Sequence, residues 1–150
     1  MEYVVYCINN IESNRKYIGC TKDYKRRMRE HKRLGFGKLK ESDFDSVNER
    51  SNRKKIGSLR QHNGLYLDMR ADSKTESDFI FEVLEVCQNQ KEMLDRENYW
   101  IKKNLLQGGY NCYWTDEDKK NHSTITKLTS KQWRIYRELY KKFMDNYNCP

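Results

Sequence analysis

The amino-acid sequence predicts a mixed α/β (α+β) fold, and three observations support this prediction. Residues 3–21 hold two β-branched and aromatic segments on either side of a polar turn, as in a β-hairpin. Residues 79–87 are almost continuously apolar, which favours a strand in the centre of a sheet. Residues 23–33 and 91–105 carry apolar side chains at helical spacing. With 150 residues, the chain is long enough for one domain with a hydrophobic core.

The hairpin is expected to place Tyr6 and Tyr17 on one surface. A turn centred between Ile11 and Glu12 puts the two tyrosines directly opposite each other, with their Cβ atoms about 5 Å apart. An aromatic pair that only packs is one interpretation of this arrangement. A pair of phenols that acts on a substrate is the other.

The helix at 23–33 has two different faces. Thr21 is expected to be its N-cap, with Asp23 in the first turn. Arg27 and His31 lie one turn apart on the face that carries the apolar residues. The opposite face holds Lys25, Arg26, Arg29, Lys32 and Arg33. This pattern fits contact with an anion, and it equally fits a helix whose polar groups reach outward from the edge of the core.

The middle of the chain gives weaker signals. Residues 35–52 are mixed and polar, so we expect a long surface loop. Residues 53–62 are expected to form a short basic helix that ends at Asn63 and Gly64. Residues 65–78 are expected to be an edge strand followed by an acidic loop.

A carboxylate interrupts the apolar stripe of the helix at 91–105. Leu94, Ile101 and Leu105 form this stripe, and Glu97 lies in its middle. An uncompensated carboxylate that faces a core is costly, so Glu97 should either pair with a cation or bind a metal. The pattern alone leaves both possibilities open.

The last 37 residues are expected to form a separate extension, because the chain turns polar from Trp114 to residue 128. We therefore divide the chain into a domain of residues 1–113 and an extension of residues 114–150. Thr129 and Gln132 form a capping box for a final helix. Its apolar stripe consists of Trp133, Tyr136, Tyr140, Phe143 and Tyr147. The stripe can dock on the domain or on a partner helix, and the helix also carries basic residues that could contact nucleic acid: Arg134, Arg137, Lys141 and Lys142.

The charge balance favours a polyanionic partner, and nucleic acid is the first candidate. Thirty Lys and Arg residues against 22 Asp and Glu give a net charge of +8. Residues 14–40 contain eleven of the basic residues and only two acids. This block is either a surface that faces phosphates or a solvated helix face.

Cysteine usage and hydropathy indicate an intracellular, reducing compartment. The five cysteines include no Cys-x-x-Cys pair, so neither a zinc site nor a disulfide framework is expected. No run of about 18 apolar residues and no signal-peptide pattern is present, so we expect no membrane partner and no secretion.

Four segments carry a resemblance to a known family: VVYCINN, KYIGCTKDYKRRMREH, RENYWIKK and GGYN. Their order and spacing resemble the GIY-YIG nuclease superfamily, especially the catalytic domain of phage-type homing endonucleases, over about residues 3–111. The glycine of the first motif is absent, since the chain reads Val4-Val5-Tyr6. The resemblance implies a small central antiparallel three-stranded sheet flanked by helices, with residues 1–113 as the catalytic domain.

The resemblance also implies the active-site residues, which are Tyr6, Tyr17, Arg27, His31, Glu97 and Asn111. Glu97 would hold a single Mg²⁺ ion, for which Mn²⁺ could substitute. Arg27 would bind a phosphate oxygen, and one tyrosine would orient or deprotonate the attacking water, with Tyr6 favoured as the base. Asn111 would position Glu97 or the backbone around the site. Weaker candidates for a further polar group are Asn52, Lys54 and His62.

The expected function is a metal-dependent DNA endonuclease of the homing type, from a phage or another viral mobile element. It would act on double-stranded DNA inside the host cell, in the cytoplasm or nucleus, and a monomer is slightly favoured. DNA contacts are expected from Lys16, Lys22, Lys25, Arg26, Arg29, Arg53 and Lys54. Two alternatives stay open: a nucleic-acid-binding module that uses the same fold without cutting, and a restriction or structure-specific repair nuclease of the superfamily.

Overall fold

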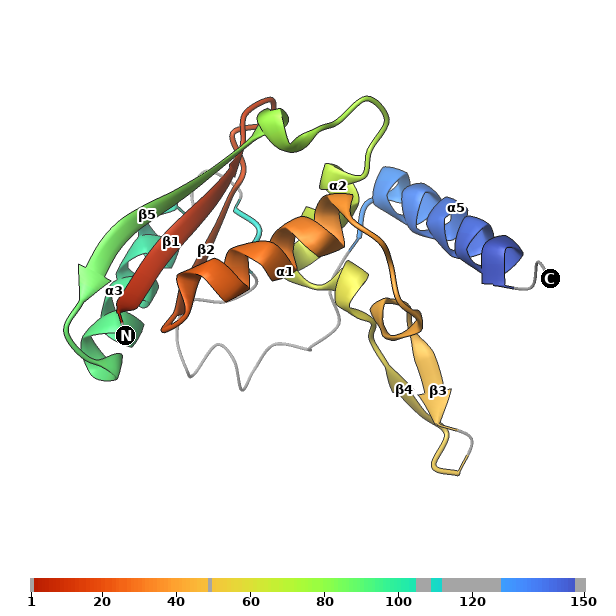
Figure 1. Cartoon of the computed structure of the whole chain (residues 1–150), viewed down its shortest axis with the longest axis horizontal. Coiled ribbons are helices and arrows are strands. Elements are labelled where there is room, and N and C mark those ends of the chain that lie inside the picture. Colours follow the sequence, from red (N-terminus) through yellow and green to blue (C-terminus); the bar gives the residue numbers. More distant parts are fainter. Residues whose placement is uncertain (1, 49, 105–108, 112–127, 148–150) are drawn as a thin grey trace.

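The computed structural model describes residues 2–48, 50–104, 109–111 and 128–147. Its centre is a three-stranded antiparallel sheet in the order β2-β1-β5, formed by β1 (Tyr3–Asn10), β2 (Lys16–Thr21) and β5 (Phe79–Cys87). The helices are α1 (Tyr24–Phe36), α2 (Leu65–Met69), α3 (Gln90–Asn104) and α5 (Ser130–Tyr147). The expected α/β (α+β) class, with a small antiparallel sheet flanked by helices, is confirmed (Figure 1).

The helices cover the two faces of the sheet separately. Tyr6 and Ile8 of β1 pack with side chains of α1 and α2 in the larger core. Val5 and Cys7 point to the other face and pack with Met93 and Ile101 of α3. This alternation follows from the period of two in a strand, and both faces of β1 are buried. None of the described helices combines the length and the apolar character needed to cross a bilayer.

The hairpin turns one residue later than the sequence suggests. Tyr6 lies opposite Gly19 and Tyr17 lies opposite Ile8, so the predicted direct pairing of the two tyrosines is wrong. Residues 11–14 form the turn, and Asn14 closes it in the left-handed region with φ 57°. The register moves by two positions, which keeps both tyrosines on one face, and their ring centroids are 6.2 Å apart.

The N-cap of α1 also differs from the expectation. Asp23, not Thr21, caps the helix, because its carboxylate accepts a hydrogen bond from the backbone N–H of Arg26 at 3.2 Å. The hydroxyl of Thr21 accepts from the backbone N–H of Asp23 instead.

The expectations for residues 35–78 are mostly wrong. The expected loop contains a 3₁₀ turn (Glu41–Asp43) and strand β3 (Ser46–Asn48), which pairs with β4 (Arg53–Lys55). The expected basic helix at 53–62 is absent, since β4 is followed there by the 3₁₀ turns Ser58–Arg60 and His62–Gly64. The expected edge strand is the helix α2, whose apolar residues are almost all fully buried, so its sequence shows no one-sided stripe.

Strand β5 has the predicted bounds but a different place in the sheet. It forms an edge, while β1 is central. Its Ile80, Val83 and Val86 side chains are 44–60% exposed, although the apolar run had suggested a central strand. Hydrophobicity alone therefore did not identify the central strand, because the burial of a strand depends on which neighbours cover it.

The buried stripe of α3 is rotated by about one residue from the prediction. Met93 and Ile101 are buried against the sheet, whereas Leu94 is 42% exposed. Leu105 lies outside the described residues. Glu97 keeps its expected position between the buried residues and is half-buried.

Helix α5 packs on the domain through Ile135 and Tyr136, which are 4% and 8% exposed. Phe44 contacts the rings of Tyr136 and Phe143, with centroid distances of 5.8 and 5.0 Å. The predicted capping box is present, since Thr129 and Gln132 exchange two hydrogen bonds. The predicted boundary between residues 113 and 114, and the side chain of Tyr147, lie outside the described part.

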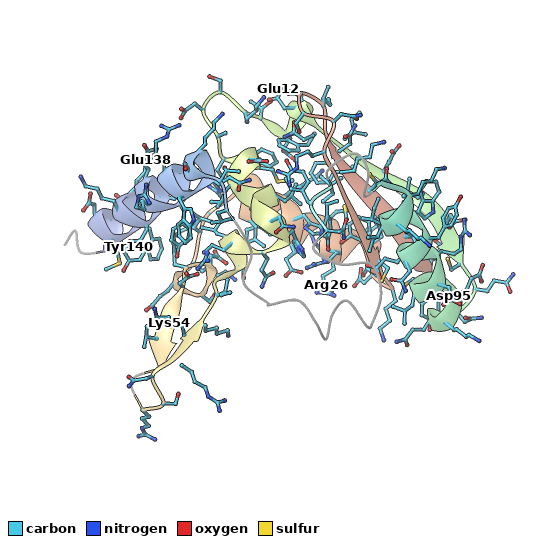
Figure 2. All side chains as sticks on the ribbon, turned by 180° about the vertical axis from the view of Figure 1, so that it is seen from behind. Glu12, Arg26, Lys54, Asp95, Glu138 and Tyr140 are labelled. Atoms are coloured by element: carbon cyan, nitrogen blue, oxygen red, sulfur yellow. The ribbon has the colours of Figure 1, made fainter. Side chains whose placement is uncertain are left out.

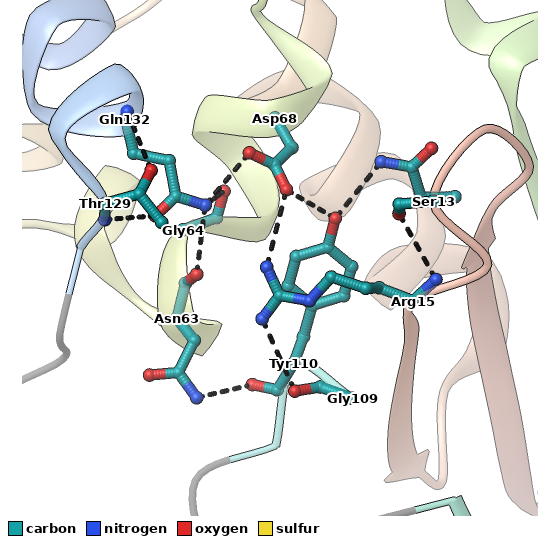
Figure 3. Close-up of polar contacts among 10 residues, drawn as sticks. Ser13, Arg15, Asn63, Gly64, Asp68, Gly109, Tyr110, Thr129 and Gln132 are labelled. Carbon is teal, nitrogen blue, oxygen red and sulfur yellow. Dashed lines mark hydrogen bonds and ion pairs between the residues drawn. The ribbon is translucent and has the colours of Figure 1, made fainter. Parts of the chain in front are cut away.

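Asp68 of α2 joins segments that are far apart in the sequence (Figure 3). Its carboxylate accepts hydrogen bonds from the Tyr110 hydroxyl at 2.5 Å and from the Gln132 amide at 2.9 Å. Arg15 lies 3.8 Å from the same carboxylate and stacks on the Tyr110 ring. Since Tyr110 is fully buried, this network fixes residues 109–111 and α5 against the hairpin and α2.

Replacing Ile135 by alanine should destabilise the protein by about 2–5 kcal/mol, because a buried branched side chain is lost and a cavity remains. Chemical denaturation measures this change. The control is Leu94→Ala on the exposed side of α3, which should cost about 0.5 kcal/mol or less. Equal costs for the two variants would contradict the packing of α5 on the domain.

Candidate active site

A buried chain of hydrogen bonds links Tyr6, His31 and Tyr66. The Tyr6 hydroxyl lies 2.7 Å from Nε2 of His31, and Nδ1 of His31 lies 2.7 Å from the Tyr66 hydroxyl. A neutral imidazole donates from one nitrogen and accepts at the other, so one phenol donates to His31 and the other accepts from it. The three residues come from β1, α1 and α2, and each is at most 1% exposed.

Burial keeps this chain uncharged at neutral pH. Burial, together with the charge of the neighbouring Arg27 cation, lowers the pKa of His31 to about 2. Burial raises the pKa of Tyr6 and of Tyr66 well above the ordinary value for a phenol. The neighbouring Arg27 cation lowers the pKa of Tyr6, but the effect of burial is the larger one.

Gly19 makes room for the two tyrosines. A Cβ atom at this position would lie 2.5 Å from the Tyr6 hydroxyl oxygen and 3.0 Å from the Tyr17 ring. The glycine of the Tyr17-Ile18-Gly19 motif is thus needed for the close approach of the phenols rather than for an unusual backbone angle.

His62 is the member of the site that sequence reasoning ranked too low. Its ring packs against Tyr17 in a tilted arrangement with a centroid distance of 4.2 Å, and its buried Nε2 atom has no hydrogen-bond partner in the described part of the chain. Burial lowers its pKa to about 3, while burial raises the pKa of Tyr17 to about 12. His62 and the following Asn63 and Gly64 all have positive φ, which turns the chain sharply before α2. The Asn63-Gly64 pair is the signal that could have located this turn.

The other two weak candidates do not join the cluster. Asn52 lies in the connection between β3 and β4, and Lys54 lies on β4, which projects away from the domain body (Figure 2).

Arg27 lies at the border between this cluster and solvent. Its cationic charge lowers the pKa of both Tyr6 and Tyr17, although burial outweighs this effect. Its guanidinium also forms an ion pair with Glu30 at 3.0 Å, and its side chain is 24% exposed. Arg27 can therefore reach the tyrosines and an anion from solvent, provided that the anion competes with Glu30.

Glu97 approaches the tyrosines from the other face of the sheet. The Cys20 thiol of β2 donates a hydrogen bond to its carboxylate, with an Sγ–Oε2 distance of 3.1 Å. The negative charge of Glu97 raises the pKa of Tyr17, so the two groups are electrostatically coupled. Because β2 is an edge strand, α3 can bring a carboxylate close to groups that lie on the opposite face.

Asn111 stabilises the backbone beside the site. Its amide oxygen accepts from the Ile18 N–H at 2.9 Å, and its amide nitrogen donates to the Ile18 carbonyl at 2.8 Å. The neighbouring Tyr110 N–H donates to the Lys16 carbonyl. Of the two positioning roles expected for Asn111, this geometry fits the one that acts on the backbone.

Glu97 suits a hard divalent cation that keeps most of its water. Among the described residues, no group of three or more His, Cys, Asp or Glu side chains could hold a metal ion. A Mg²⁺ ion commonly uses one or two protein carboxylates together with water and substrate phosphates, so a single half-buried carboxylate fits its chemistry.

The basic residues expected to contact DNA fall into three groups. Lys22, Lys25, Arg26 and Arg29 are exposed on or just before α1. Arg53 and Lys54 are exposed on β4. Lys16 is half-buried on β2, and its strand position places it on the face opposite to Tyr17.

Stability should fall between about pH 6.5 and pH 5, because His31 and His62 take up protons in the unfolded chain near pH 6.5 but stay neutral in the fold. The slope that each histidine contributes should rise through this window and approach about 1.4 kcal/mol per pH unit near pH 5. Urea unfolding at several pH values measures the slope, and His62→Asn should remove about half of it. A free energy of unfolding that stays constant over this range would contradict the burial of neutral histidines.

Comparison with known proteins gives the family. A family model described as the GIY-YIG catalytic domain matches residues 2–111. A solved structure of the catalytic domain of intron endonuclease I-TevI, in a glutamate-to-alanine variant, is 25% identical, covers 77% of this chain and 97% of that chain, and superposes with a TM-score of 0.45. No curated protein matches the chain. With most of its length matched by the family model, the chain belongs to the GIY-YIG family and is a nuclease that acts on phosphodiester bonds.

Proposed function

We propose that this nuclease is a divalent-metal-dependent DNA endonuclease that hydrolyses phosphodiester bonds by attack of water. The observation that carries the proposal is the position of Tyr17 between opposite charges. Arg27 lowers its pKa and Glu97 raises it, so both groups act on one point. A cation for the phosphate and a carboxylate for a metal ion, on either side of a polar group, are the parts that phosphodiester hydrolysis needs.

Arg27 binds a non-bridging oxygen of the scissile phosphate. The phosphate displaces Glu30, which now pairs with the guanidinium at 3.0 Å. A guanidinium can donate two parallel N–H hydrogen bonds to a phosphate group. Its positive charge also offsets the negative charge that builds up on the phosphate as water attacks. The ion pair with Glu30 keeps Arg27 oriented before DNA arrives.

His62 accepts the proton of the attacking water, and Tyr17 orients that water. The Nε2 atom of His62 is buried and unpartnered, whereas the Tyr6 hydroxyl is already bonded to His31 and has a raised pKa. His62 is neutral in the free enzyme. An anionic phosphate nearby raises the pKa of an imidazole, which makes His62 a stronger base once DNA is bound. Tyr6, His31 and Tyr66 then position the active site instead of reacting.

Glu97 is the residue that would hold the metal ion, with Mg²⁺ as the proposed ion and Mn²⁺ as a substitute. When bound, the ion supplies charge neutralisation for the phosphate and for the leaving oxygen. The thiol of Cys20 hydrogen-bonds the Glu97 carboxylate and so restrains its orientation. This contact requires a reduced cysteine, which supports an intracellular, reducing location.

Double-stranded DNA is the proposed substrate, because exposed basic residues on α1 and β4 offer phosphate contacts beyond the site itself. A homing-type role in a phage or viral element, and action as a monomer, are proposed on the sequence resemblance. A module that binds without cutting has no use for the charged pair of Arg27 and Glu97 around Tyr17, which favours the enzyme. A restriction or repair role would leave the same chemistry unchanged.

Replacing Glu97 by glutamine should abolish Mg²⁺-dependent cleavage of supercoiled plasmid while DNA binding in EDTA stays unchanged, because the carboxylate acts on the metal and not on the duplex. The matched control is Asp95→Asn on the exposed side of the same helix, which should cut at the wild-type rate. Metal-dependent cutting by the Glu97 variant at the wild-type rate would overturn the proposed metal ligand.

Two further variants separate the candidate bases. His62→Ala should lower kcat by about 10²–10⁴-fold, the usual loss when a general base is removed. Tyr6→Phe should destabilise the fold by about 1–2 kcal/mol through the lost bond to His31, with a much smaller effect on kcat. Single-turnover cleavage and urea unfolding supply the two readouts. If Tyr6→Phe instead lowers kcat more than His62→Ala does, the base role belongs to Tyr6.

A further inference from the structure

Strands β3 and β4 form a two-stranded ribbon that projects from the domain body (Figure 1). Its described strand side chains, those of Ser46, Val47 and residues 53–55, are all exposed. Val47 is 56% exposed and therefore adds little to a core. An isolated pair of short strands is marginally stable in water, so packing within the ribbon does not account for its presence.

The base of the ribbon is held firmly. The Asp45 carboxylate accepts from the Gly57 N–H at 2.8 Å and pairs with Arg60, so it ties the two ends of the ribbon together. The backbone N–H of Asp45 donates to the Tyr136 hydroxyl at 2.9 Å, which connects the ribbon to α5. A Cβ atom at Gly57 would collide with the backbone of residues 43–44, so the two ends lie against each other. These contacts fix the direction in which the ribbon points.

The ribbon is strongly basic. Residues 46–55 contain four basic residues and one acid, so they supply +3 of the net charge of +8. Arg53 and Lys55 point to one face of the ribbon, and Lys54 points to the other with Val47, as the register requires. A surface hollow on the ribbon is lined by Ser46, Val47, Ser51, Arg53, Lys54 and Lys55. Cations on both faces suit a partner with phosphates on two sides.

The major groove of B-DNA is such a partner. It is about 12 Å wide and about 8.5 Å deep, and it admits a two-stranded ribbon between its two phosphate backbones. Neighbouring strands lie about 4.8 Å apart, which leaves room for side chains on both sides. Lys54 on the ribbon and Arg26 on α1 both lie on the lower side of the molecule in Figure 2, where one duplex can meet both elements.

We propose that the β3–β4 ribbon is a second DNA-binding element, which enters the major groove next to the cut and sets the position of the duplex in the active site. The proposal rests on DNA as the substrate of the nuclease. It assigns the ribbon to duplex binding and leaves the chemical step to the residues around Tyr17.

The variant Arg53→Ala/Lys54→Ala/Lys55→Ala should bind a fluorescent mixed-sequence DNA duplex more weakly in EDTA. The slope of log Kd against the logarithm of the salt concentration should be smaller by about 2–3 than that of the wild type. Each lost phosphate contact lowers this slope by about 0.9. The charge-matched control Lys91→Ala/Lys102→Ala/Lys103→Ala changes exposed lysines on α3 and should leave the slope unchanged. Equal affinities and slopes for the two triple variants would overturn the proposal.

A modified duplex tests the groove. Glucosylated 5-hydroxymethylcytosine fills the major groove without changing the phosphate charge, so the wild type should bind this duplex about tenfold more weakly than plain DNA. The ribbon variant should bind both duplexes equally. If the wild type also binds both equally, the ribbon does not enter the major groove. The major groove of an RNA duplex is too narrow for side chains, so the wild type and the ribbon variant should bind such a duplex with similar affinity. If the ribbon variant loses RNA binding more than DNA binding, the ribbon binds RNA and the proposal is wrong.

These binding measurements need no cleavage, so they separate two kinds of failure. If the wild type never cuts DNA but the ribbon variant alone loses duplex binding, the proposed catalytic function fails and the ribbon assignment stands. If the wild type cuts DNA in Mg²⁺ and the ribbon variant has the same DNA affinity and cleavage rate as the wild type, the catalytic function stands and the ribbon assignment fails.

Discussion

His31 accepts or donates a hydrogen bond at both ring nitrogens, and these two bonds join β1, α1 and α2 at one point. The bonds are buried, so leaving either phenol without its partner would cost about 1–3 kcal/mol. They hold the Tyr6 ring beside Tyr17, and Gly19 provides the space for this contact. The position of Tyr6 beside Tyr17 thus follows from a hydrogen-bonded pair of phenols around a neutral imidazole.

Two layers of polar aromatic residues have different tasks. The inner layer of Tyr6, His31 and Tyr66 is closed to solvent and has its hydrogen bonds satisfied, which fits the positioning role proposed for it. In the outer layer, Tyr17 and His62 lie next to Arg27, which is part-exposed, and His62 keeps a buried nitrogen without a partner. An unsatisfied buried nitrogen is costly in the free enzyme, so it fits a group that gains its partner when substrate and water bind.

Segments distant in the sequence complete this site. Asn111 forms hydrogen bonds with the backbone of Ile18. The neighbouring Tyr110 donates a hydrogen bond to Asp68, which also accepts one from Gln132 of α5. Helix α5 in turn holds the base of the β3–β4 ribbon through Tyr136. Packing of the C-terminal helix is therefore coupled to the edge of the catalytic sheet and to the proposed DNA contact. This coupling explains why a helix outside residues 2–111 belongs to the same folded unit.

Local patterns in the chain were enough to define the hairpin, α1 with Arg27 and His31, the bounds of β5 and the position of Glu97 on α3. These features depend on strand and helix periods, which neighbouring residues set by themselves. The edge position of β5 and the burial of α2 depend on long-range contacts. The hairpin register and the β3–β4 ribbon depend on turns whose geometry the residue types alone did not reveal. His62 joins the site because a left-handed turn brings it against Tyr17, 45 positions earlier in the sequence, and the burial of its ring is what lowers its pKa. A sequence pattern holds no information on such desolvation, since burial arises only when separate segments pack together.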